Sequence, residues 1–230
     1  MKLQFCFFFL FFLFVACNRQ TKISTTILTT QEKFYCDSLE IDSTLVLRLR
    51  TKTDSAIIPF PTDLQFVLDK DMDVDSTGKK ATGFIFNAST VNSDEIITDL
   101  YSDFQTKGYT IFYVNRNFGI GAKSDNIGIL KTVDKYQILK QLQTDGINWG
   151  IDTDSLIKLI KAFDHKYSLQ LIGASGDWCE FMINREPESW MTLANEAYKV
   201  CPDIVDQGSQ TVEKLADEMK QTKRLYFWWD

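Results

Sequence analysis

Carboxylates and an amide near the C-terminus are the residues of this chain whose types and spacing suggest chemistry. Asp203, Asp206 and Gln207 follow a Cys-Pro pair and precede a Gly-Ser pair. Their side-chain oxygens could bind a cation, or they could cap a helix that begins near Ser209 by accepting hydrogen bonds from its first backbone amides. Short polar side chains before a helix usually serve the second purpose. We therefore expect capping, and we predict neither a metal site nor a cofactor.

Tryptophans supply a second candidate site. The chain ends in Phe-Trp-Trp-Asp, and Trp178 stands next to Asp177 earlier in the sequence. Trp178 and Trp228 could form a stacking platform for a ligand, and the plainer alternative is that both fill the core. The candidate binding or motif residues are Asp177, Trp178, Asp203, Asp206, Gln207, Trp228, Trp229 and Asp230.

Acidic pairs are a third candidate, because two carboxyl groups can hydrolyse a glycosidic bond together. Asp177 with Glu180, or Asp203 with Asp206, could form such a pair, but the sequence assigns no catalytic residue. His165 is the single histidine, which excludes multi-histidine zinc sites. We therefore expect a protein that is not an enzyme, with a carboxylate-dependent hydrolase of an envelope polymer as the alternative.

The two cysteines of the C-terminal region both fall on predicted core faces. Cys179 alternates with Phe181 in a strand pattern, and Cys201 continues the apolar stripe of the preceding helix. A disulfide between Cys179 and Cys201 is one reading, and two buried free thiols are the other.

The N-terminus resembles a secretory leader. Lys2 precedes an apolar run from Phe5 to Ala16, and Cys17 follows at once, as in the lipobox of bacterial lipoproteins. The run is too short for a spanning helix, which needs about 20 apolar residues. We expect cleavage after residue 16 and a lipid on Cys17, with residues 17–31 as a flexible tether; ordinary signal cleavage is the alternative. The folded part would then lie outside the cytoplasm, in the periplasm or facing the cell surface.

The charge balance limits the choice of partner. The chain carries 25 Lys and Arg residues against 31 Asp and Glu residues, a net charge of −6. Nucleic acids are bound largely through cationic patches, so we expect no nucleic-acid partner.

Apolar patterns predict the elements that position these residues. Residues 32–90 read as a β-rich region, with strands at Leu45–Leu49, Phe66–Leu68 and Phe84–Phe86. Residues 91–230 read as an α+β domain that begins with a helix capped by Asn92. From Thr153 onwards the predicted order is helix, strand, strand, helix, helix, strand. We predict an α+β fold, a two-layer sandwich of a mostly antiparallel sheet with helices on one face, and a ferredoxin-like arrangement as one form of it.

Three segments carry a family resemblance: Thr144 to Asn148, Gly173 to Trp178, and Cys201 to Gly208 followed by the terminal Phe-Trp-Trp-Asp. Over roughly residues 108–230 the chain resembles the uncharacterised bacterial family named domain of unknown function 4253. The resemblance implies a domain assignment and no reaction.

These observations favour a lipid-anchored envelope protein that binds another macromolecule through its α+β domain. An immunity protein that neutralises an envelope-acting toxin would be one example. The expected partners are a membrane, through the lipid on Cys17, and a protein of the envelope.

Overall fold

The computed structural model describes residues 27–60, 83–89, 92–117 and 124–230. The predicted signal segment, Cys17 and the predicted strand at Phe66–Leu68 lie outside these ranges. Within them, no helix combines the length and the apolar character needed to cross a bilayer.

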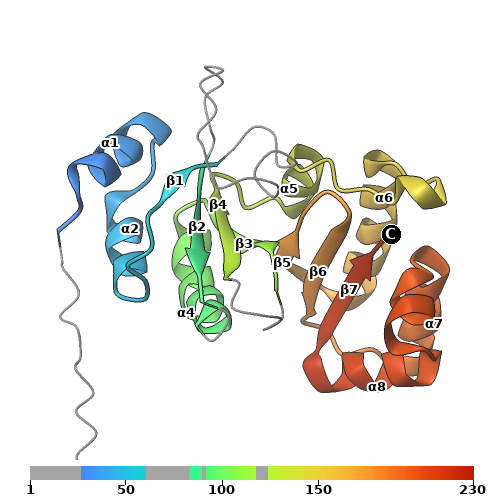
Figure 1. The fold of residues 1–230 in the computed structure, drawn as a ribbon. Coiled ribbons are helices and arrows are strands. Elements are labelled where there is room, and N and C mark those ends of the chain that lie inside the picture. Colours follow the sequence, from blue (N-terminus) through green and yellow to red (C-terminus); the bar gives the residue numbers. More distant parts are fainter. Residues whose placement is uncertain (1–26, 61–82, 90–91, 118–123) are drawn as a thin grey trace, which may run out of the picture.

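A seven-stranded sheet forms the centre of the molecule (Figure 1). Its strand order is β1-β2-β4-β3-β5-β6-β7, and every neighbouring pair is antiparallel except β3 with β5. The strands are β1 Ile58–Pro59, β2 Gly83–Ala88, β3 Thr110–Asn115, β4 Asp125–Leu130, β5 Leu169–Ala174, β6 Trp178–Ile183 and β7 Arg224–Trp228.

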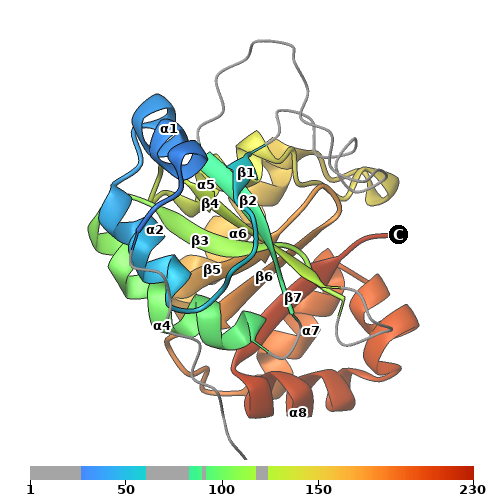
Figure 2. The same ribbon diagram turned by 60° about the vertical axis from the view of Figure 1, so that its left-hand side comes forward.

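Helices cover both faces of this sheet (Figure 2). One face packs against α1 Thr30–Leu39, α2 Ser43–Arg50 and α4 Ser93–Thr106. The other packs against α5 Lys135–Gln141, α6 Thr153–Tyr167, α7 Trp190–Val200 and α8 Val212–Thr222. Successive residues of β3 point to opposite faces, so Ile111 and Tyr113 join the first core while Phe112 and Val114 join the second.

The predicted α+β class and mostly antiparallel sheet are confirmed. The helices α1, α2 and α4 add a third layer to the predicted two, because β2, β3 and β4 are apolar on both faces and must be covered on both. The arrangement also differs from a ferredoxin-like one, in which a further strand separates the two parallel strands. Here β3 and β5 are direct neighbours.

The strand predicted at Leu45–Leu49 is wrong, because this segment is helix α2. Asp42 caps the helix by accepting a hydrogen bond from the backbone N–H of Thr44. Leu45, Val46 and Leu49 are buried, a spacing that fits one face of a helix. The described part of residues 32–60 therefore contains α1, α2 and the short β1, whereas Phe84–Phe86 lies in β2 as predicted.

The order predicted from Thr153 onwards is confirmed, with β5, β6 and β7 packed beside α6, α7 and α8. Because β3 and β5 run parallel and β7 is antiparallel to β6, the carboxyl ends of β3, β5 and β7 lie at one end of the sheet. The turn from β5 to β6, at Ser175 to Asp177, lies at this same end.

Candidate functional site

The three sequence segments that suggested a family meet at this end of the sheet. The backbone N–H of Asp145 donates to the carbonyl of Gly176 over 2.8 Å, and the Thr144 hydroxyl donates to the carbonyl of Ser175 over 2.7 Å. Gly146 lies against the ring of Trp229, where an added Cβ would come within 2.8 Å of the indole. These residues therefore join the loop before η1 (Ile147–Trp149), the β5–β6 turn and the chain end into one surface.

Asp203 holds this surface together. Its buried carboxylate accepts hydrogen bonds from Nε1 of Trp149 at 2.8 Å, from the backbone N–H of Asp230 at 3.1 Å and from the Gln207 amide at 3.1 Å. Burial alone would raise the pKa of Asp203, but these hydrogen bonds together lower it. Asp203 is thus an ionised structural anchor.

The prediction that Asp203, Asp206 and Gln207 cap the last helix is wrong. These residues lie at and within a short π-helix, η2 (Ile204–Ser209). The cap of α8 is Thr211, whose hydroxyl accepts from the backbone N–H of Lys214. Asp206 instead accepts a hydrogen bond from the Tyr198 hydroxyl at 3.0 Å.

The two terminal tryptophans have different environments. Trp229 is 3% exposed and stacks on Phe227 with ring centroids 5.8 Å apart, so it belongs to the core. Trp228 points to the opposite face of β7, where it is half-buried. Only Trp228 of this pair can take part in a surface site.

Trp178, Tyr226 and Trp228 form what we call the aromatic face. Trp178 is registered with Trp228 across β6 and β7, and Glu180 is registered with Tyr226. The rings of Trp178 and Tyr226 lie 5.9 Å apart. Gly173 allows Trp178 to lie against β5, because an added Cβ there would come within 2.6 Å of the indole ring.

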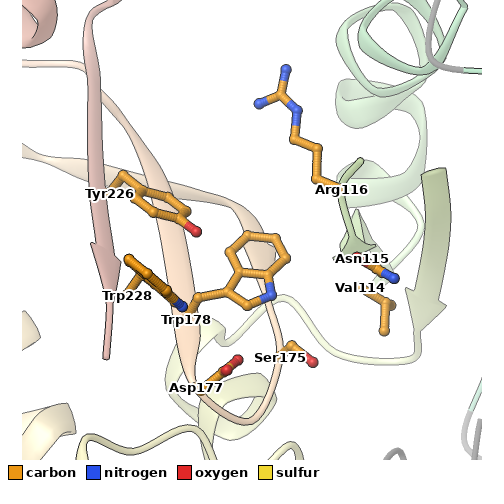
Figure 3. Close-up of a pocket in the computed structure, with 8 residues that line it drawn as sticks. All are labelled: Val114, Asn115, Arg116, Ser175, Asp177, Trp178, Tyr226 and Trp228. Carbon is orange, nitrogen blue, oxygen red and sulfur yellow. The ribbon is translucent and has the colours of Figure 1, made fainter. Parts of the chain in front are cut away.

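Two adjoining cavities border the aromatic face. The smaller, which we call the small pocket, has a volume of about 280 Å³ and is shown in Figure 3. The larger has a volume of about 670 Å³ and extends over β7 towards η2 and α8. Arg116, Tyr226 and Trp228 line both. The small pocket is lined by Val114, Asn115, Arg116, Ser175, Asp177, Trp178, Tyr226 and Trp228.

A network of four charges lines the larger cavity, and one member of it, Arg116, also lines the small pocket. Arg116 contacts Glu180 at 3.0 Å and Asp94 at 3.1 Å, and Arg224 contacts the same two carboxylates at 2.9 Å and 3.1 Å. The side chain of Glu180 is 5% exposed, so this carboxylate is buried between two guanidinium groups. Pairing with both arginines makes Glu180 a structural residue of the site rather than a free acid.

Asp94 completes the network at the start of α4. Burial would raise its pKa, but a 2.8 Å hydrogen bond from the Tyr113 hydroxyl and the positive charges of Arg116 and Arg224 lower it. The pKa of Tyr113 is raised, chiefly by burial. Sequence reasoning missed Arg116, Arg224 and Asp94, since Arg224 and Asp94 are 130 residues apart in the chain.

Asp177 has a different electrostatic environment. Its pKa is raised by burial and by the negative charges of Asp230 and Asp145. Asp177 therefore keeps its proton at a higher pH in the folded chain than in the unfolded chain.

Replacing Asp177 with asparagine should therefore stabilise the protein at pH 7. The raised pKa stabilises the folded state only below the unfolded-state pKa of about 4, and this contribution is lost as the pH rises through the folded-state pKa. We expect a gain of less than about 1 kcal/mol for the variant at pH 7, since solvent screens an exposed carboxylate. Urea unfolding at pH 3.5 and 7 measures it; a gain equally large at both pH values would contradict the assignment.

The cysteines follow the free-thiol alternative. Cys179 and Cys201 are both buried and unbonded, as is Cys36. The Cys201 thiol donates to the carbonyl of Trp228 at 2.8 Å, and burial raises its pKa to about 11. This hydrogen bond connects Cys201, at the end of α7, to the backbone of the edge strand β7. In the described ranges no cluster of three or more His, Cys, Asp or Glu side chains could hold a metal ion.

A match to a known protein family covers all three of the segments that meet at this site. Residues 126–230 match the model of a family described as "Domain of unknown function (DUF4253)". No curated protein and no solved structure matches the chain. The match covers two of the three strands that meet at the candidate site, β5 and β7, together with β6. Residues 126–230, somewhat less than half of the chain, are therefore similar to this family of domains of unknown function.

Proposed function

We propose that this chain is a binding module of a bacterial cell envelope, anchored to a membrane leaflet by a lipid on Cys17. It recognises an envelope macromolecule with the aromatic face. The observation that carries this proposal is the position of Tyr226 and Trp228, which are half-buried and line both adjoining cavities. Ligand sites in proteins are typically concave, with aromatic walls and a few polar groups.

The charge network supports binding rather than catalysis. Glu180 and Asp94 each hold both Arg116 and Arg224, so these four groups fix the shape of the cavity walls. An acid or base catalyst needs a proton-transfer group that can reach its substrate. An immunity-type module, which blocks a toxin that acts in the envelope, is one form that such a binder could take.

The anchor is tested in cells of a related bacterium by comparing the full chain with its Cys17→Ala variant. We expect the unaltered chain in the membrane fraction, with a lipid-modified Cys17 by mass analysis, and we expect the variant to lose both properties. A soluble chain without lipid, cleaved elsewhere, would contradict the anchor.

The binding face is tested in the same cells with a photo-crosslinking amino acid at position 228. The matched control places it at Val133, which is 54% exposed and lies at the opposite end of the sheet, beside the start of β5. We expect a discrete adduct from position 228 only. Identical adducts from both positions, or none from position 228, would contradict the proposed face.

A carboxylate-dependent hydrolase of an envelope polymer is the second candidate, and one observation favours it. Asp177 lines the small pocket and its pKa is raised, as a general acid requires. Its proposed partner Glu180, however, is held by two arginines, and Asp203 is held by Trp149, Asp230 and Gln207. Release of new reducing ends from isolated cell wall by the purified chain, and not by its Asp177→Asn variant, would favour this candidate.

A further inference from the structure

The small pocket contains polar groups that the protein itself does not satisfy. Nε1 of Trp178, the Ser175 hydroxyl and the side-chain amide of Asn115 form no hydrogen bond with any residue in the described ranges. Trp178 and Ser175 are nevertheless only 8% and 3% exposed. Because none of these three groups is a fully shielded atom, each can take a water molecule or a ligand as its hydrogen-bond partner.

The unsatisfied groups open into the small pocket. Among the described residues, every side-chain nitrogen or oxygen that is fully shielded from solvent has a hydrogen-bond partner. The three groups without one are therefore accessible to solvent, and their residues all line the small pocket. In Figure 3 the indole nitrogen of Trp178 is directed to the side where Ser175 and Asn115 lie.

The types of these groups restrict the ligand. An indole N–H can only donate, so the ligand must offer an acceptor oxygen to Trp178. The Ser175 hydroxyl and the Asn115 amide can each both donate and accept. Hydroxyl groups satisfy all three sites, whereas a quaternary ammonium ion, which suits aromatic walls, offers nothing to an indole N–H.

The charges around the pocket disfavour an anion. The guanidinium group of Arg116 is already paired with Glu180 and Asp94, and Asp177 adds a carboxyl group to the wall. Tyr226 and Trp228 supply flat apolar surfaces, which suit the apolar faces of a sugar ring. A volume of about 280 Å³ is close to the lower limit of roughly 300–1,000 Å³ for ligand pockets, which fits a single ring.

We infer that the small pocket binds one neutral sugar unit of an envelope glycan, with its hydroxyls on Trp178, Ser175 and Asn115 and its ring against Trp228. This inference rests on the proposed function and names the chemical class of its ligand.

The test is a titration of the full chain, purified in a zwitterionic detergent without a sugar headgroup, with free glucose, galactose and N-acetylglucosamine. Ligand-detected nuclear magnetic resonance reports the binding. We expect a dissociation constant on the order of 1 mM for at least one of these sugars, as suits a ligand of about a dozen heavy atoms. Deoxy analogues that lack a contacting hydroxyl should bind at least tenfold more weakly, because the protein group loses its water on binding and is then left unpaired.

Trp178→Phe keeps an aromatic ring and removes only the N–H, so it should weaken sugar binding about tenfold. Ser175→Ala is a second variant in case the first perturbs the fold. The matched control is Trp190→Phe, which alters a half-buried indole at the start of α7, outside the small pocket; its binding should stay within twofold of wild type.

The outcomes separate this inference from the proposed function. Binding of tetramethylammonium in place of every sugar, or equal loss in the Trp178→Phe and Trp190→Phe variants, would overturn the sugar assignment. Absence of sugar binding together with a crosslink from position 228 would overturn the sugar assignment and leave the binding function in place. Sugar binding without that crosslink would support the sugar site in the small pocket and contradict the proposal that the aromatic face recognises a macromolecule.

Discussion

Replacing Glu180 with alanine should destabilise the fold by about 3 kcal/mol. Removal of one partner from a buried ion pair typically costs about 3–5 kcal/mol, because the other charge is left without compensation. Arg116 and Arg224 would keep Asp94, which places the expected cost at the lower end of that range. Guanidinium chloride unfolding measures the effect as a lower midpoint with an unchanged slope.

The control for Glu180 is Glu186→Ala. Glu186 is exposed and pairs with Lys223 at 2.9 Å, and exposed pairs contribute little to stability. Glu180→Gln should lie between the two, since the amide keeps one acceptor oxygen but loses the charge. Equal midpoints for Glu180→Ala and Glu186→Ala would show that the network carries no structural role.

The adjacent tryptophans should respond in opposite ways to truncation. Trp229→Ala should cost about 3–5 kcal/mol, because it removes a buried ring that stacks on Phe227 and covers Gly146. Trp228→Ala removes a half-buried ring and should cost much less, while it weakens ligand binding. Unfolding should be followed by far-ultraviolet circular dichroism, because each variant changes the tryptophan fluorescence itself. Equal losses of stability would contradict the separate assignment of the two rings.

The fold of the C-terminal part could be predicted because its patterns are local. The alternation of Cys179 with Phe181 fits a strand, and both residues lie in β6; the helix predicted from Thr153 onwards is α6. Leu45, Leu47 and Leu49 also alternate, yet they lie in α2. Over so few residues, an apolar pattern fits a strand and a helix equally well.

The candidate site could be predicted only in part, because many of its contacts join residues that are far apart in the sequence. Trp178 and Trp228 could be singled out by type, and they do line one pocket. Asp203 was expected to cap a nearby helix, but its partner Trp149 comes from 54 residues away. Contacts between residues so far apart in the sequence leave no local pattern. For the same reason Arg116, Arg224 and Asp94 could not be predicted as site residues.

The parallel pair β3 and β5 divides the sheet into two antiparallel parts, and β3 is registered with β5 at Tyr113 and Gly173. The small pocket straddles this seam. Asn115 and Arg116 come from one side, at the end of β3, while Ser175, Trp178 and Trp228 come from the other. The family segment starts at residue 126, beyond β3 and α4. The unit recognised by sequence is therefore smaller than the unit that could bind a ligand, and an excised segment 126–230 would carry only one wall of the pocket.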